Sequence, residues 1–194
     1  KEITPPRIRE PQIKAGKGTK RSEDGRQIIA AVSGTPKLGA DGKIYVRGML
    51  PIEGDIGVDT GNVEFEGCIE ASGSVQAGYT VKGGGLHTAG IEDATVEVAD
   101  NVVSDGGVYG STITAGGTLK ASHLHNCTIQ VLGDLVVEKE IIQCTIETNG
   151  RCLINDGKII ASTINSKKGI QTREIGTEAS KPAKLVVGID HQYE

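Results

Sequence analysis

One short phrase recurs five times between residues 84 and 166, and it limits what this chain can fold into. The phrase is a small residue, Thr, an aliphatic residue and a polar residue, and its first copy is Ala94-Thr95-Val96-Glu97. The later copies begin at Ser111, Cys127, Cys144 and Ser162. The five threonines lie 17, 16, 17 and 18 residues apart. A repeat at a nearly fixed period indicates stacked, similar structural units.

Two further apolar columns have the same period. One column is Leu86, Val102, Leu119, Leu135, Cys152 and Ile170, and the other is Ile91, Val108, Leu124, Ile141, Ile159 and Ile175. An earlier repeat is predicted at Ile69, Val75 and Val81, and a fainter first repeat at Ile52, Val58 and Val63. Successive apolar positions within a repeat lie five to seven residues apart. That interval is too short for amphipathic helices and suits short strands, each followed by a bend.

These intervals predict an all-β fold. Three strands and three bends make one coil, and each strand pairs in parallel with its counterpart one repeat along, roughly 4.8 Å away. Val96, Ile113, Ile129, Ile146 and Ile164 should then form one column inside a narrow core. We therefore predict a parallel three-sided β-helix (β-solenoid) with about seven coils of 16–18 residues. The crossover preference of parallel strands favours a right-handed coil.

Glycine placement fits a coiled chain. The sequence contains 28 glycines, and aromatic residues make up only 3% of it, as expected for a core only a few side chains wide. Glycine reaches positive φ without steric cost. We therefore expect the glycines at the bends to have positive φ, namely Gly84, Gly85, Gly106, Gly107, Gly116, Gly117, Gly133 and Gly150.

Composition and turn signals divide the chain into four parts. Residues 1–16 are predicted to be an extended, Pro-containing lead-in, and residues 17–51 a small N-terminal β-module. Asp24-Gly25 and Asp41-Gly42 in that module predict tight antiparallel hairpins. The β-helix is predicted over 52–176, and a terminal strand and tail over 177–194. Because the chain starts at Lys1 and no cap follows the last strand, we expect the natural chain to be longer.

Charge and hydropathy argue against several kinds of partner. The net charge is −4, and the sequence has neither a basic stripe nor an aromatic platform, so nucleic acid binding has little support. No apolar run is long enough to cross a membrane, and no signal-peptide pattern opens the chain. The four cysteines lack the density of a secreted disulfide framework. A cytoplasmic location is therefore predicted.

The motifs, taken in order, resemble the flagellar assembly protein A (FapA-like) family. Its β-solenoid is matched by residues 61–67 (GNVEFEG) and 78–85 (GYTVKGGG). Residues 22–25 with 34–38 resemble its N-terminal β-module, and residues 175–177 with 185–190 resemble the end of its solenoid. The resemblance implies a bacterial, cytoplasmic, non-enzymatic β-helix, normally followed by a helical region. It further implies a link to flagellar or cell-surface assembly and a likeness to the polymerising bactofilins, and it offers no catalytic motif.

A histidine-rich segment has residue types that bind metals. His123, His125 and Cys127 stand at alternate positions, so an extended strand would place all three on one face. The alternative is that the two histidines decorate a bend while Cys127 fills a small inward slot. Because Leu124 is predicted to point inward, the histidines should point outward, away from Cys127. We favour the second interpretation and predict no metal site.

The cysteines are best interpreted as structural. Cys127 and Cys144 hold the same repeat position and should lie one above the other. Parallel ladder neighbours seldom meet the torsion that a disulfide needs, so two buried thiols are favoured. Cys152 replaces an aliphatic residue, whereas Cys68 should face solvent or a bend. No cysteine has the His and carboxylate pattern of a nucleophile.

The remaining candidates for chemistry are weak. The Gly-Gly pairs lead into strands, whereas a phosphate-binding loop precedes a helix. Outward acids occur singly, as a solvated face would have them, rather than as catalytic pairs: Glu64, Glu70, Glu92, Glu97, Glu138 and Glu147. We therefore predict no catalytic, cofactor-binding or metal-binding residue and no cofactor.

Three function classes follow. The preferred one is a non-enzymatic scaffold that binds proteins or copies of itself, without nucleic acid, membrane insertion or a small-molecule substrate. A hexapeptide-type acyltransferase is the second, although intervals of 16 and 17 depart from the 18-residue coil that resemblance would require. A carbohydrate-active β-helix enzyme is the third, although the long loops that build a cleft are missing.

Overall fold

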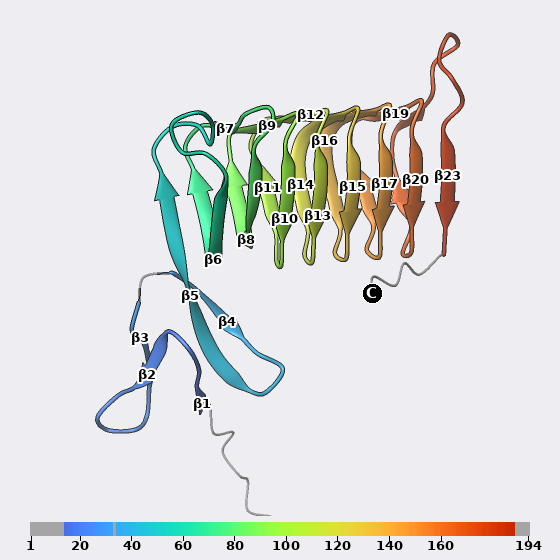
Figure 1. Ribbon diagram of the computed structural model, residues 1–194. Helices are drawn as coiled ribbons and strands as arrows, with labels where there is room; N and C mark the ends of the chain where they lie inside the picture. Colours follow the sequence, from blue (N-terminus) through green and yellow to red (C-terminus); the bar gives the residue numbers. More distant parts are fainter. Residues whose placement is uncertain (1–13, 33, 189–194) are drawn as a thin grey trace, which may run out of the picture. The chain divides into compact units, whose positions relative to one another are not determined.

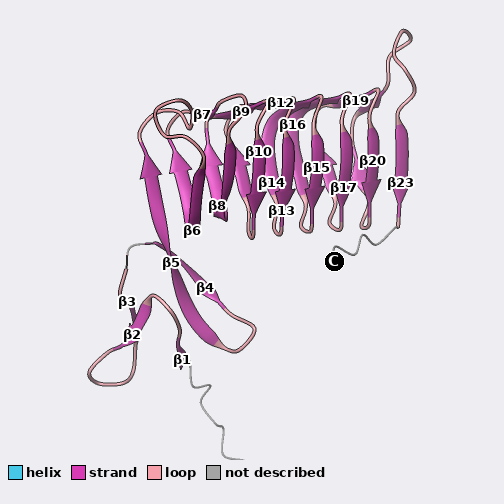
Figure 2. Ribbon diagram, viewed as in Figure 1, coloured by secondary structure: helices cyan, strands magenta, loops and turns pink. Residues whose placement is uncertain are grey.

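The computed structural model describes residues 14–32 and 34–188. The chain divides into two compact units, with the boundary between Gly48 and Met49. Every regular element in the described residues is a strand, and these residues contain no helix that could span a membrane (Figure 2). The predicted lead-in falls largely on residues 1–13, outside the described part.

The first unit consists of short strands joined by hairpins. Its strands are β1 (Lys14–Ala15), β2 (Thr19–Arg21), β3 (Ile28–Ala30), β4 (Gly34–Leu38) and most of β5 (Lys43–Ile52). β2 pairs antiparallel with β3, and β4 with β5. In each turn an aspartate, Asp24 or Asp41, accepts a hydrogen bond from the amide two residues on, at 3.1 Å. Gly25 and Gly42 have φ of 69° and 73°. The two predicted hairpins are confirmed.

The second unit is a parallel β-solenoid (Figure 1). Its strands after β5 are β6 (Val63–Ala71), β7 (Ser74–Val75), β8 (Thr80–Thr88), β9 (Gly90–Glu92), β10 (Thr95–Val98), β11 (Val102–Ser104), β12 (Gly107–Tyr109), β13 (Thr112–Ala115), β14 (Leu119–His125), β15 (Thr128–Val131), β16 (Leu135–Ile142), β17 (Thr145–Thr148), β18 (Cys152–Ile154), β19 (Lys158–Ile160), β20 (Thr163–Ser166), β21 (Ile170–Gln171), β22 (Glu174–Ile175) and β23 (Lys184–Val187).

The coils have three sides, and each side is a parallel sheet. The first sheet contains the ends of β5, β6 and β8, then β11, the starts of β14 and β16, β18 and β21. The second contains the starts of β6 and β8, then β10, β13, β15, β17, β20 and β23. The third contains β7, β9, β12, the ends of β14 and β16, β19 and β22.

The predicted inward column is present in the second sheet. Val96, Ile113, Ile129, Ile146 and Ile164 are paired one above the other, and each is 0% exposed. Val63 and Val81 extend this column at one end and Leu185 at the other. The two other predicted columns are also in register from Ile69 to Ile170 and from Val75 to Ile175. The parallel solenoid prediction is confirmed, with about eight coils in the second sheet.

The prediction for the first coil is wrong in two positions. Leu50, 19 residues before its partner in the next coil, occupies the position predicted for Ile52. Ile56 occupies the position predicted for Val58, which is 83% exposed. A tight turn over residues 57–61, closed by a backbone hydrogen bond of 2.7 Å, lengthens this coil. The added residues break the 17-residue spacing there.

The stack extends beyond residues 52–176. Residues 49–51 of β5 pair with β6, and residues 184–187 form β23, which pairs with β20 as one more coil. The segment between β22 and β23 is the long loop at the red end of Figure 1. β23 is therefore part of the solenoid unit.

The prediction that the bend glycines have positive φ is also wrong. None of the eight glycines named above has a positive φ. They are needed for close approach between coils instead, because a Cβ at Gly116 would lie 2.3 Å from the Ala99 carbonyl oxygen. A Cβ at Gly106 would lie 2.5 Å from the carbonyl oxygen of Ala89. Steric room between successive coils thus selects glycine at these bends.

Positive φ occurs at a different bend, directly before the repeated phrase. The residues there are Gly78, Asp93, Gly110, Asn126, Gln143 and Ala161, with φ between 42° and 84°. Side chains other than glycine rarely adopt this left-handed conformation, and each such residue stores strain. The regular stack therefore repeats one left-handed residue in successive coils.

Candidate functional site

The outer surface of the third sheet holds the densest group of polar and aromatic side chains. Leu124 is fully buried, and its neighbours His123 and His125 lie on the outer surface, as predicted. Tyr109 pairs with His125 from the preceding coil, and Glu140 pairs with His123 from the following coil. Repetition of the coil thus brings together residues 14 to 17 positions apart.

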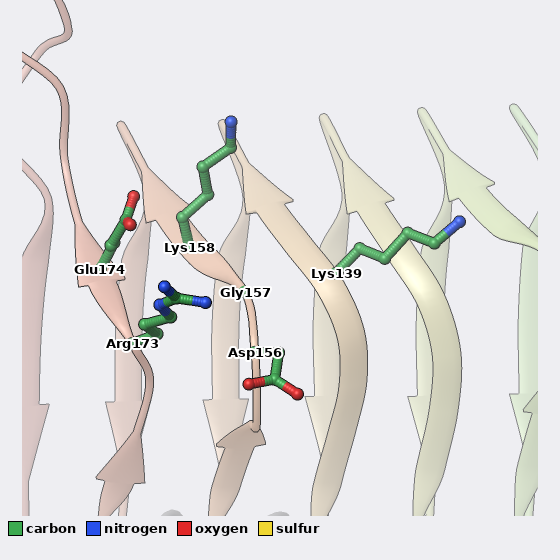
Figure 3. A pocket seen from close by; sticks show the side chains of 6 residues that line it. All are labelled: Lys139, Asp156, Gly157, Lys158, Arg173 and Glu174. Atoms are coloured by element: carbon green, nitrogen blue, oxygen red, sulfur yellow. The ribbon is translucent and has the colours of Figure 1, made fainter.

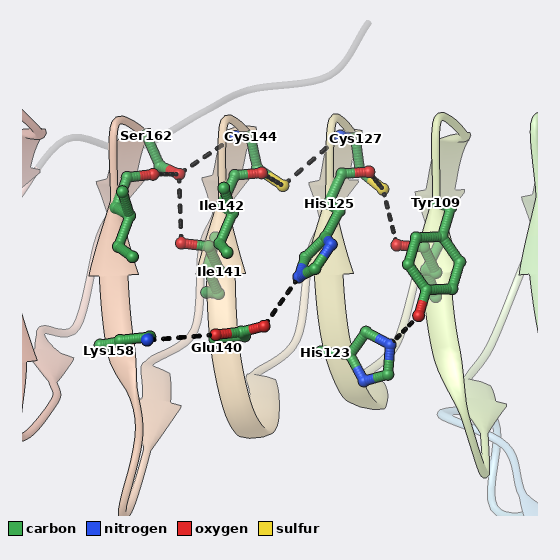
Figure 4. A network of polar contacts seen from close by, with 12 residues as sticks. Tyr109, His123, His125, Cys127, Glu140, Ile141, Ile142, Cys144, Lys158 and Ser162 are labelled. Carbon is green, nitrogen blue, oxygen red and sulfur yellow. Dashed lines mark hydrogen bonds and ion pairs between the residues drawn. The ribbon is translucent and has the colours of Figure 1, made fainter. Parts of the chain in front are cut away.

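These residues form a continuous line of contacts, which we call the histidine face: Tyr109, His123, His125, Glu140 and Lys158 (Figure 4). The Tyr109 hydroxyl is hydrogen bonded to His123 Nε2. Glu140 Oε1 lies 3.1 Å from His125 Nε2, and Glu140 Oε2 lies 3.6 Å from Lys158 Nζ. The face crosses four coils.

The three rings of the histidine face pack on one another. The Tyr109 ring centroid lies 5.1 Å from that of His123 and 5.4 Å from that of His125, both edge-on. The His123 and His125 centroids are 5.3 Å apart. A Cβ at Gly107 would lie 2.2 Å from His123 Nε2, so the absence of a side chain there leaves room for this ring.

Partial burial affects the protonation of His123. Burial lowers the pKa of His123, and the neighbouring His125 and Lys139 lower it further. The imidazole is therefore neutral at pH 7, because even its ordinary pKa lies near 6.5. A neutral imidazole can accept a hydrogen bond or bind a metal ion.

A shallow depression of about 220 Å³ lies beside the histidine face (Figure 3). Its lining residues are Lys139, Asp156, Gly157, Lys158, Arg173 and Glu174. Small-molecule sites are usually concave and mostly apolar, with a few polar groups. This depression has no apolar wall, so its shape and chemistry suit a contact with a charged surface better than an enclosed ligand.

Cys127 is not part of the histidine face. Cys127 and Cys144 are free thiols, each 2% exposed, in the inward slot of the repeated phrase, as predicted. The Cys127 amide donates to Cys144 Sγ at 3.4 Å, and the Cys144 amide donates to Ser162 Oγ at 3.1 Å. Each slot side chain in turn donates to the carbonyl oxygen two residues before it. These side chains satisfy backbone groups at the bend (Figure 4).

The thiol environments fit structural roles. A hydrogen bond from the Cys144 thiol lowers the pKa of Cys127, and the same contact with burial raises the pKa of Cys144. Burial raises the pKa of Cys152 to about 12. Cys68 is partly exposed, and burial raises its pKa as well. A reactive thiol needs a lowered pKa together with solvent access.

The outward acids stand beside cations or amides. Glu97 lies 2.8 Å from Lys82, and Glu70 Oε1 lies 3.9 Å from His87 Nδ1. No group of three or more His, Cys, Asp and Glu side chains in the described ranges is placed to hold a metal ion. Sequence reasoning singled out the two histidines but missed Tyr109, Glu140 and Lys158. Their positions in the repeat were the available signal.

Comparison with known proteins identifies the second unit. A model of the family described as Flagellar Assembly Protein A beta solenoid domain matches residues 48–194, which is more than half of the chain. No curated protein and no solved structure gives a match. The matched segment contains the whole parallel stack described above. This chain therefore belongs to the Flagellar Assembly Protein A β-solenoid family.

Proposed function

We propose that this chain is a non-enzymatic scaffold in bacterial flagellar or cell-surface assembly, and that its sheet faces bind proteins or further copies of the chain. The observation that carries the proposal is the uninterrupted register of the solenoid. One outward column of the second sheet consists of threonines at the same position in successive coils: Thr80, Thr95, Thr112, Thr128, Thr145 and Thr163.

Rigidity supports a scaffold role. The bends between strands are hydrogen bonded from coil to coil, as in the bonds from the Thr112 and Thr128 amides to carbonyl oxygens of the preceding coil, both 3.0 Å. A preorganised surface loses little conformational entropy when a partner binds. Repeat proteins commonly use such extended surfaces for binding.

The environment of the cysteines supports a cytoplasmic location. All four thiols are free, and three are buried. The net charge of −4 and the mixed charges on the outer faces favour protein partners over nucleic acid. The proposal includes neither a cofactor nor a small-molecule substrate.

Outward substitutions test the assembly role without disturbing the core. A strain lacking the gene should be complemented with the wild type and with one arginine variant for each sheet: Val136→Arg, Thr128→Arg and His125→Arg. Loss of flagella or motility with one variant, at unchanged melting temperature, would identify the docking face. Normal flagella and motility in the deletion strain would contradict the assembly role.

The enzymatic alternatives need a separate assay. The purified chain should be incubated with acyl-CoA and amino sugars, and separately with acidic polysaccharides. We expect no turnover above a heat-denatured control. Turnover that disappears in His123→Ala or Glu140→Gln would overturn the non-enzymatic assignment.

A further inference from the structure

The geometry of the histidine face points to a metal site. His123 and His125 stand at i and i+2 of one strand, on its outer surface, with ring centroids 5.3 Å apart. Two imidazoles that bind one ion at 2.0–2.1 Å have centroids separated by roughly 4.5–5.2 Å, by the metal–nitrogen distance and the ring size. The two rings are therefore already near the separation of a chelate.

We propose that His123 and His125 together bind one divalent transition ion of the class that prefers imidazole, such as Zn²⁺, Ni²⁺ or Cu²⁺. Imidazole nitrogen suits these ions, whereas Mg²⁺ and Ca²⁺ prefer oxygen. The other coordination positions are filled by water or by a group from a partner. This proposal stands apart from the scaffold role and does not depend on it.

Neighbouring side chains favour this use of the rings. The Glu140 carboxylate lies 3.1 Å from His125 Nε2, and carboxylates commonly orient metal-binding histidines in this way. Tyr109 contacts Nε2 of His123 and packs against both rings. Metal binding requires an unprotonated imidazole, and the lowered pKa of His123 extends that form to lower pH.

The proposed site differs from the one considered from the sequence. That hypothesis joined both histidines to Cys127, and Cys127 lies in the inward slot instead. The described residues offer no group of three His, Cys, Asp or Glu side chains, so the new site has two protein ligands. Glu140 acts here as a positioning residue, shared between His125 and Lys158.

Calorimetric titration tests the proposal. ZnCl₂ is titrated into the purified chain with a non-thiol reductant, and MgCl₂ is the comparison ion. We expect one saturable Zn²⁺ site, no Mg²⁺ binding, and loss of the site in His123→Asn and in His125→Asn. Loss of the orienting carboxylate in Glu140→Gln should weaken binding about tenfold.

The remaining histidines provide matched controls. His87 lies on the first sheet with Glu70 and Asp105, so His87→Asn and His191→Asn should leave Zn²⁺ binding unchanged. In the wild type, Zn²⁺ should shift the imidazole NMR signals of His123 and His125 together. Unchanged binding in either His123→Asn or His125→Asn, loss of the site in His87→Asn, or the absence of a saturable site would overturn the proposal.

Discussion

Ala161 and Gln143 stand in the left-handed conformation at bends where other coils use glycine. Their φ values are 49° and 52°, at the position that Gly78 and Gly110 hold in other coils. A residue with a Cβ pays about 1–2 kcal/mol in that conformation. The repeat therefore fixes the backbone at this bend even where the local sequence disfavours it.

Replacing Ala161 by glycine should stabilise the protein. Relief of strain outweighs the greater entropy of glycine in the unfolded chain, so Ala161→Gly should raise the free energy of unfolding by about 1 kcal/mol. Urea unfolding measures the change. Ala99, an exposed alanine without a positive φ, is the control, and Ala99→Gly should be destabilising. A loss of stability in Ala161→Gly would contradict the assigned backbone conformation.

The buried Cys152 thiol should make stability fall at alkaline pH. Burial raises its pKa to about 12, above its ordinary value of 9.0, so the folded state keeps the proton that the unfolded state loses. This contribution is complete below about pH 9 and is lost as pH rises towards about 12, at no more than about 1.4 kcal/mol per pH unit.

Urea unfolding at several pH values between 8 and about 11 measures this effect. Cys152→Val is the matched variant, because Cys152 stands between the aliphatic Leu135 and Ile170 in its column. The variant should lose less stability than the wild type over that range. Equal pH profiles would show that Cys152 is not a buried thiol.

At this scale the sequence predicted orientation but not contact. Alternation along the strand was enough to place Leu124 inside and His123 and His125 outside. The contacts with Tyr109 and Glu140 required the pairing of side chains across coils, which depends on rotamers as well as on register. The candidate site could therefore be predicted only in part.

At the scale of strands and bends, close approach between coils limits which residues fit. Gly116 joins β13 to β14, and a Cβ there would meet the Ala99 carbonyl oxygen of the preceding coil at 2.3 Å. Backbone atoms on both sides of this contact belong to paired strands. Neither side can move without loss of inter-coil hydrogen bonds.

Gly116→Ala should therefore destabilise the stack by about 1–3 kcal/mol, the usual cost of overpacking. Thermal and urea unfolding give the value. Gly85→Ala is the comparison, because its nearest contact would be at 3.2 Å and the cost should be smaller. An equal or smaller loss in Gly116→Ala would show that the bend has room.

The strands themselves were predictable because the aliphatic columns repeat. The first coil was not, since Ile52 and Val58 lie at the right spacing but Leu50 and Ile56 hold the column positions. A turn that adds residues leaves the alternation of inward side chains unchanged, so spacing alone cannot locate it. The bend glycines were correctly located but for the wrong physical reason.

At the scale of the whole solenoid, stability is shared between neighbours. Each coil contacts mainly the coils before and after it, so no coil buries its apolar residues alone. The scaffold role and the histidine face both depend on this, because each uses side chains that only the stacking brings together.

Distances along the outward threonine column test that stacking most directly. Nitroxide labels are placed at pairs of these positions in a Cys68→Ser background, and pulsed electron spin resonance measures the separations. Thr80 with Thr145 and Thr95 with Thr163 are each four coils apart. Thr80 with Thr163 spans five coils.

The stack predicts equal separations of about 19 Å for the two four-coil pairs and about 24 Å for the five-coil pair, one strand spacing more. Identical label orientations cancel the tether contribution to that difference. Unequal four-coil separations, or a five-coil pair no longer than them, would contradict the in-register solenoid.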